Sequence, residues 1–216
     1  MSEERESFRP RKTQLTIQIA GAAIFGALSL VVSALTTPIL PRVPGWGIAY
    51  FDPVSIIWVM CFLIFGPLSG ILCCVIGMFG LMPFDSFAPI GPIMKLCATL
   101  SLIIIPILLL KLYKSEESVL NSPKLKEPKK YIICGLLGIG LRIGVMMIFN
   151  IWLFMTMFAG GLEFVSLEFM GLPGVSGWSA VVIGVILINA ETSVWDLLIP
   201  YLVVYGAKLD KTFEIW

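Results

Sequence analysis

Histidine is absent from this chain of 216 residues, and charged residues make up only 13% of it. Without histidine the chain has no imidazole for acid–base catalysis, for ligation of haem or for a histidine-containing zinc site. Hydrophobic residues reach 58%, whereas ordinary soluble domains are about 45–50% apolar and roughly 25% charged. A water-soluble fold of this size could not cover so much apolar surface, so the sequence predicts a membrane protein.

Several motifs of enzymes and nucleotide-binding proteins are missing as well. No G-x-x-x-x-G-K-[ST] occurs, so we do not expect the chain to bind and hydrolyse ATP by itself. No G-x-S-x-G presents a serine nucleophile. We therefore expect neither an enzyme nor a bound cofactor or metal, and no nucleic-acid partner. The cysteines lie in apolar stretches without a C-x-x-C pair and are expected to be small buried hydrophobic residues. They are Cys61, Cys73, Cys74, Cys97 and Cys134.

Charged residues and proline–glycine clusters divide the chain into six apolar segments. A transmembrane helix needs about 20 apolar residues. The uncharged run 53–84 is too long for one such helix and too short for two, so we place a tight turn at Gly66-Pro67. The sequence thus predicts an all-α integral membrane protein with six transmembrane helices. The expected spans are Leu15–Leu35, Val54–Phe65, Leu68–Leu81, Ile90–Leu112, Tyr131–Phe158 and Trp178–Tyr205.

Lysine and arginine lie almost entirely on one side of these spans. Four precede the first span, six lie in residues 111–130 and two follow the last span, which makes twelve of the fifteen. Because short cytoplasmic loops carry the excess of lysine and arginine, both termini are predicted to be cytoplasmic. Residues 1–14 and 207–216 are expected to form cytoplasmic tails on a membrane domain of residues 15–206. The chain is expected to be a multi-pass protein of the cell membrane.

Three charged residues are predicted to lie deep in the membrane. Arg142 belongs to the fifth span, and Glu191 and Asp196 belong to the sixth. A charge at depth costs about 2.5–3.5 kcal/mol on translocon scales and usually faces a partner or a cavity. We expect an intramembrane ion pair of Arg142 with Asp196 or with Glu191. This pair would either lock the two spans together or take part in ligand-driven gating.

A second group of polar and aromatic residues is predicted near the outer ends of the spans. Such a set could form an outward-facing pocket with aromatic walls and a few directed polar groups, which is the usual composition of a small-molecule site. Anchoring at the membrane interface is the alternative role for the aromatic residues. The candidate substrate-binding residues are Trp46, Tyr50, Asp52, Lys95, Asn150 and Asn189.

Small residues recur at helical spacing along the first span. Ala20, Ala23 and Ala27 include an A-x-x-x-A, the last two residues being four positions apart. Small side chains allow another helix to approach closely. The partner of this alanine stripe is either an internal helix or a separate subunit.

In the order and spacing of these features the chain resembles the S components of energy-coupling factor (ECF) transporters, from the first span to the last. The resemblance rests on the alanine stripe, the Pro/Gly-rich first loop and FDPVSIIWVMCFLIFGPLSG, with its aspartate and its Gly-Pro turn. The riboflavin-binding members look most similar. APIGPIMKLCAT is similar to the segment before their fourth span, and VMMIFNIWLFMTMFAGG resembles their fifth span, with Asn150 matching an asparagine.

The last span ends in IPYLVVYG, which is similar to the I-P-F-N-x-x-K-G of those members. Leu202 and Tyr205 stand where that motif has its asparagine and its lysine, and Lys95 stands where the fourth-span segment often has a small polar amide. A hypothesis from this difference is that Lys95 supplies the missing cation from another span.

The resemblance implies a substrate-capture subunit. It would bind riboflavin or a related vitamin at the outer face, with Trp46 on a covering loop. It would then dock through Ala20, Ala23 and Ala27 onto a membrane scaffold subunit driven by two ATPase subunits, and topple in the bilayer to release the vitamin inside. The competing hypothesis is a stand-alone, proton-coupled secondary transporter in which Arg142, Glu191 and Asp196 form the relay.

Overall fold

The computed structural model describes residues 11–40, 51–85, 87–112 and 122–216. Within these ranges every regular element is a helix, and one isolated antiparallel bridge joins Ser166 to Ser176. The all-helical fold predicted from the sequence is confirmed. The elements are α1 (Arg11–Thr36), α2 (Pro53–Phe65), α3 (Pro67–Leu81), α4 (Ile90–Leu112), α5 (Ser122–Leu125), α6 (Pro128–Thr156), the 3-10 helices η1 (Ala159–Phe164) and η2 (Glu168–Met170), α7 (Gly177–Gly206) and α8 (Leu209–Phe213).

Four helices, α1, α4, α6 and α7, are long and apolar enough to cross a membrane, whereas α2 and α3 are apolar but shorter. The chain is therefore a helical, membrane-embedded protein. Each of the six apolar segments predicted from the sequence is a helix, and their ends differ from the predicted ones by at most four residues. The largest difference is at α1, because Arg11–Gln14 continue the helix instead of belonging to a tail.

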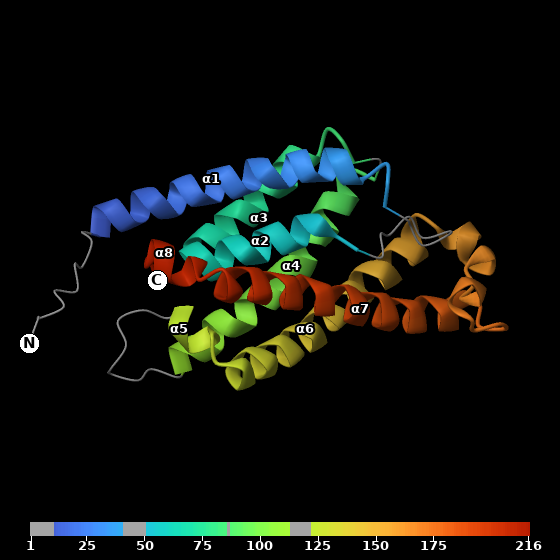
Figure 1. Ribbon diagram of the computed structural model, residues 1–216. Coiled ribbons are helices and arrows are strands. Elements are labelled where there is room, and N and C mark those ends of the chain that lie inside the picture. The colour runs from blue at the N-terminus through green and yellow to red at the C-terminus, as the bar shows by residue number, and fades with distance from the viewer. Residues whose placement is uncertain (1–10, 41–50, 86, 113–121) are drawn as a thin grey trace, which may run out of the picture.

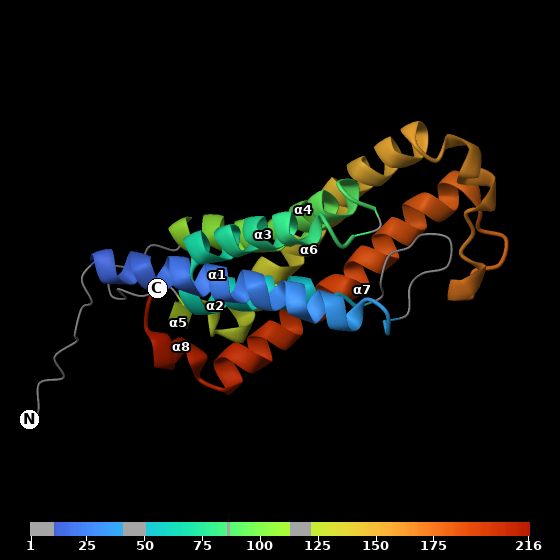
Figure 2. The ribbon, with the colours of Figure 1, turned by 90° about the horizontal axis from the view of Figure 1, so that it is seen from above.

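Helix α2 is the core of the bundle. It packs against α1, α3, α4, α7 and α8, while α1, α3, α4, α6 and α7 pack in that order, each against the next (Figures 1 and 2). All but two of its 13 residues are buried, which suits a helix that is apolar all round. At the end that carries η1 and η2, α6 and α7 extend beyond the other helices (Figures 1 and 2).

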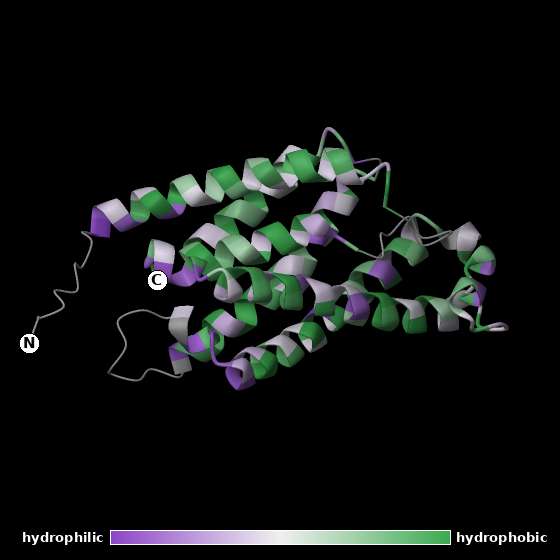
Figure 3. Cartoon of the chain, in the orientation of Figure 1, coloured by the Kyte–Doolittle hydropathy of each residue, from purple (hydrophilic) through white to green (hydrophobic). Residues whose placement is uncertain are grey.

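The outer surface of the bundle is strongly apolar. Large hydrophobic side chains such as Phe79 of α3, Leu136 of α6 and Leu202 of α7 are more than half exposed. Figure 3 shows hydrophobic residues covering the lengths of the helices, with most hydrophilic residues at their ends and a few in the middle. Without an apolar solvent this surface would be unfavourable, and lipid provides that solvent.

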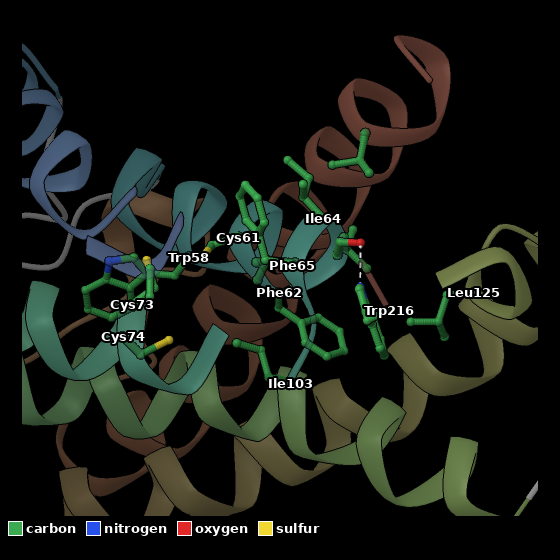
Figure 4. Close-up of a cluster of buried hydrophobic side chains, with 14 of the residues drawn as sticks. Trp58, Cys61, Phe62, Ile64, Phe65, Cys73, Cys74, Ile103, Leu125 and Trp216 are labelled. Carbon is green, nitrogen blue, oxygen red and sulfur yellow. Dashed lines mark hydrogen bonds between the residues drawn. The ribbon is translucent and has the colours of Figure 1, made fainter. Parts of the chain in front are cut away.

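The turn that joins the end of α2 to the start of α3 is covered by residues 214–216. Trp216 packs its ring against Phe62, with 5.2 Å between the ring centroids, and donates a hydrogen bond from Nε1 to the Leu63 carbonyl oxygen at 3.1 Å (Figure 4). Residues 207–216 were predicted to be a tail. In the structure they form α8 and bury Ile215 and Trp216, because two large apolar side chains follow the charged residues there.

Gly66 allows the α2–α3 turn and the approach of Trp216 at the same time. Its backbone has φ 96° and ψ −176°, a region that is essentially restricted to glycine. A Cβ atom at this position would lie 2.8 Å from the Trp216 ring.

Replacing Gly66 with alanine is expected to lower the free energy of unfolding by about 1–3 kcal/mol, which is the cost of this backbone conformation for a residue other than glycine. The contact of the new Cβ atom with the Trp216 ring would add to this loss. Thermal unfolding of the purified protein in detergent measures the loss. Gly144→Ala in α6 is the matched control, because nothing lies within 4 Å of a Cβ atom there. Equal melting temperatures for the two variants would contradict the role given to Gly66.

Candidate functional site

The first buried polar cluster joins the middle of α6 to α7. Arg142 is 6% exposed and Asp196 fully buried, and Arg142 Nη1 lies 2.5 Å from Asp196 Oδ2. The rest of the guanidinium is also used, because Nε donates to Asn189 Oδ1 at 3.3 Å and Nη2 donates to Thr192 Oγ1 at 3.1 Å. The α6–α7 pair is therefore fixed by one arginine that holds three side chains of α7.

Asp196 retains capacity for another partner. Within the described residues its Oδ1 atom is buried and accepts no hydrogen bond, although Oδ2 is paired with Arg142. Removing a carboxylate oxygen from water without a compensating partner is costly. This half-satisfied carboxylate is therefore a position at which a proton, a water or a ligand group would be stabilised.

The second polar cluster lies where α2 begins. Asp52 caps α2 by accepting from the Val54 backbone N–H at 3.1 Å and from Ser55 Oγ at 3.0 Å, and Pro53 at the first helical position favours that start. Lys95 of α4 reaches the same carboxylate, with Nζ 3.0 Å from Oδ1. Thr99 Oγ1 of α4 donates to Ser55 Oγ at 3.0 Å, so two polar links join α4 to α2.

The charges of this second cluster are mutually stabilised. Burial by itself would raise the pKa of Asp52, but the neighbouring Lys95 ammonium and the hydrogen bonds from Lys95, Ser55 and Val54 outweigh it and lower the pKa. The lysine and aspartate side chains retain 26% and 17% exposure.

Asn150 lies on α6, two turns beyond Arg142 along the helix. It is buried, and its Nδ2 donates to the Met146 carbonyl oxygen of its own helix at 2.8 Å. Met146 belongs to a buried cluster against which Met94 and Cys97 of α4 pack. Asn150 is therefore on the α6 surface that meets the first half of α4, the helix that carries Lys95.

The residues that the sequence predicted for one pocket do not all lie together in the structure. Asp52 and Lys95 come together, whereas Asn189, predicted for the same pocket, joins Arg142 instead. Trp46 and Tyr50 lie outside the described residues. Arg142 pairs with Asp196 and not with Glu191.

Glu191 lies on the opposite side of α7 from the Arg142 cluster. It is exposed, and its Oε1 accepts a hydrogen bond from Trp195 Nε1 at 2.8 Å. The helical positions explain this, because Asn189, Thr192 and Asp196 share one side of a helix with 3.6 residues per turn, and Glu191 projects from the other side.

Three hydroxyl groups of these clusters, those of Ser55, Thr99 and Thr192, were not predicted from the sequence. Thr192 is three residues after Asn189 and four before Asp196, so all three lie on one face of the helix. This spacing could have predicted Thr192 as a member of the Arg142 cluster. Asp52 followed by Pro53 is typical of a capped helix start, and Ser55 lies in the first turn of that helix, within reach of the aspartate. Thr99 has no such local signal, because its partner lies on another helix.

Comparisons of the chain with known protein families, with curated proteins and with solved structures give no match. Among the described residues, no three Cys, Asp or Glu side chains group as metal ligands. What the geometry provides is two ionic clusters between apolar helices, a buried one around Arg142 and Asp196 and a partly exposed one around Asp52 and Lys95. Such clusters can orient a polar ligand or hold helices in register.

Proposed function

We propose that the chain is the substrate-capture subunit, or S component, of an ECF-type vitamin uptake transporter. In this proposal it crosses the cell membrane six times with both termini in the cytoplasm. It binds riboflavin or a related planar vitamin at the outer face and passes it inward after docking onto a scaffold subunit that works with two ATPase subunits.

The observation that carries this proposal is the division of α1 into two small-residue faces. Gly21, Ala22, Gly26 and Ser29 are buried against the bundle, and Cβ atoms at the two glycines would meet Phe65 and Ile76 at 2.8 Å. The stripe Ala20, Ala23 and Ala27 is exposed on the opposite side of the same helix. The internal approach of helices thus uses the glycine face, and the alanine face is left for a separate subunit.

The arrangement of basic residues supports the proposed orientation. The start of α1, α5, the start of α6 and α8 lie at one end of the bundle, with hydrophilic residues concentrated there (Figures 1 and 3). Glu163 and Glu168 lie in η1 and η2 at the opposite end. By the positive-inside rule the first end faces the cytoplasm.

In this orientation the Asp52–Lys95 pair and Asn150 are on the outer half of the bundle, where the vitamin is captured. An ammonium, a carboxylate and an amide could hold the polar edge of a flavin-like ring. We assign Lys95 and Asn150 as the principal ligand-binding residues, with Asp52 positioning Lys95.

Lys95→Ala and Asn150→Ala are each expected to weaken riboflavin binding about ten- to a hundredfold, because each leaves a polar group of the ligand unpaired at a cost of about 1–3 kcal/mol. Isothermal titration with the purified protein measures the change. Lys111→Ala, at the other end of α4, is the matched control and should bind as the wild type does.

Wild-type affinity in both variants would remove Lys95 and Asn150 from the site. If riboflavin and a panel of other vitamins all fail to bind to the wild-type protein, the vitamin proposal itself fails, beginning with riboflavin.

A second candidate function, a stand-alone proton-coupled carrier, is favoured by one observation, the unpartnered Oδ1 of buried Asp196. Uptake by such a carrier would stop with an uncoupler and continue after loss of ATP. An ECF transporter would respond in the opposite way, so uptake of labelled vitamin under the two treatments separates the candidates.

A further inference from the structure

Glu191 is an acidic residue on the lipid-facing surface of α7. It is 14 residues from Gly177 and 15 from Gly206, so it lies about 21 Å from either end of the helix. A hydrocarbon core is about 30 Å thick. Wherever a slab of this thickness is placed along the length of α7, Glu191 lies at least about 7 Å inside it.

The surroundings of Glu191 form a continuous exposed stripe. Leu187, Val194, Trp195, Leu198 and Leu202 are between 40% and 58% exposed and follow one another at helical spacing. Within this stripe Glu191 has one hydrogen-bond donor, the Trp195 indole. Its short side chain cannot reach the headgroups, so an ionised carboxylate there is left in hydrocarbon with one neutral donor, which is unfavourable.

The described part of the chain has no cation available for this carboxylate. Lys95 is paired with Asp52, and Arg142 is buried and paired with Asp196. The remaining described lysines and arginines all lie near the ends of helices or between them. They are found in the first turn of α1, in the last turn of α4, between α5 and the first turn of α6, and between Lys208 and Lys211. The described residues of a second copy of the chain would therefore bring no accessible positive charge to the middle of this stripe.

We propose that the Leu187–Leu202 stripe of α7 is the contact surface for a transmembrane helix of another protein, which carries a lysine or an arginine near its midpoint. The basic side chain pairs with Glu191, and the Trp195 indole holds the carboxylate in place. The apolar residues on either side supply the packing. This contact goes beyond the proposed function, because it requires no vitamin and would exist in a chain that bound none.

Photo-crosslinking in native membranes tests the proposal. A photoreactive amino acid in place of Val194, three residues after Glu191 on the same stripe, is expected to cross-link to a transmembrane segment. Mass spectrometry of the cross-linked peptide should find a lysine or an arginine in the central turns of that segment. The matched control places the same amino acid at Leu136, which is 64% exposed on α6, and should not capture this segment.

The charge of Glu191 is then tested in the Val194 background. Glu191→Gln keeps an acceptor for Trp195 but removes the charge, and should lower the cross-link yield roughly five- to thirtyfold, as expected for one polar contact between membrane helices. Glu191→Asp should retain most of the yield. The proposal is overturned by a cross-link only to lipid, by a peptide of this same chain, by a segment without a basic residue, or by an unchanged yield in Glu191→Gln.

Discussion

Replacing Arg142 with alanine is expected to lower the free energy of unfolding by about 3–5 kcal/mol, the usual cost of leaving one member of a buried ion pair without its partner. The variant would leave the Asp196 carboxylate with no described hydrogen-bond partner, because Oδ1 already has none and Oδ2 is held by Arg142. Asn189 and Thr192 would lose their contacts to the guanidinium as well. Uptake of a proton by Asp196 would relieve part of this cost.

Double variants identify the partner. Combining Arg142→Ala with Asp196→Ala should recover part of the lost stability, because no buried charge then remains. Combining it with Glu191→Ala should recover none, because Glu191 lies on the other side of α7. Thermal or denaturant-induced unfolding in the same detergent compares the variants. Simple additivity of the Arg142 and Asp196 losses would show that the pair contributes no coupling energy.

Uptake is expected to be abolished when Ala23 and Ala27 are both replaced by tryptophan, while binding of the vitamin to the purified variant stays unchanged. The two alanines face away from the bundle, so the added bulk prevents approach of a second helix without disturbing internal packing. Transport of labelled riboflavin by cells that contain the complete transporter measures the first effect, and titration of the purified subunit measures the second.

Two further substitutions give this experiment its controls. Leu28→Trp, on an exposed flank of α1, adds bulk beside the alanine stripe and should leave uptake intact. Ala22→Trp, at a fully buried position, should destabilise the fold and reduce binding. Normal uptake by the Ala23 and Ala27 double variant would show that the exposed alanine face is not a docking surface.

The sequence was sufficient to predict the helices but not their rotation about their own axes. Long uncharged runs and the Gly66-Pro67 pair define the apolar segments, because charge and helix-breaking residues are local signals. The partner of Arg142 was left open between Asp196 and Glu191, since both lie at comparable depth. The choice depends on which side of α7 faces α6, although the shared spacing of Asn189, Thr192 and Asp196 already favoured one side.

The grouping of the other polar residues was predicted less well for the same reason. Lys95 and Asp52 are 43 residues apart in the chain, and only the packing of α4 against α2 brings them together. Asn189 was assigned by depth alone and belongs to the Arg142 cluster. The burial of Trp216 was not anticipated either, because four charged residues between Lys208 and Glu214 are typical of a solvated segment.

The unequal lengths of the outer helices give the protein an uneven hydrophobic belt. On the side of α3, whose exposed residues include Ile71 and Phe79, the 15-residue helix offers only about 22 Å of apolar wall. On the side of α6 and α7, helices of 29 and 30 residues extend about 44 Å. A bilayer of uniform thickness cannot match both walls without local thinning or tilting of the whole body. We therefore expect the tilt of this protein in the membrane to change with the thickness of the surrounding lipid.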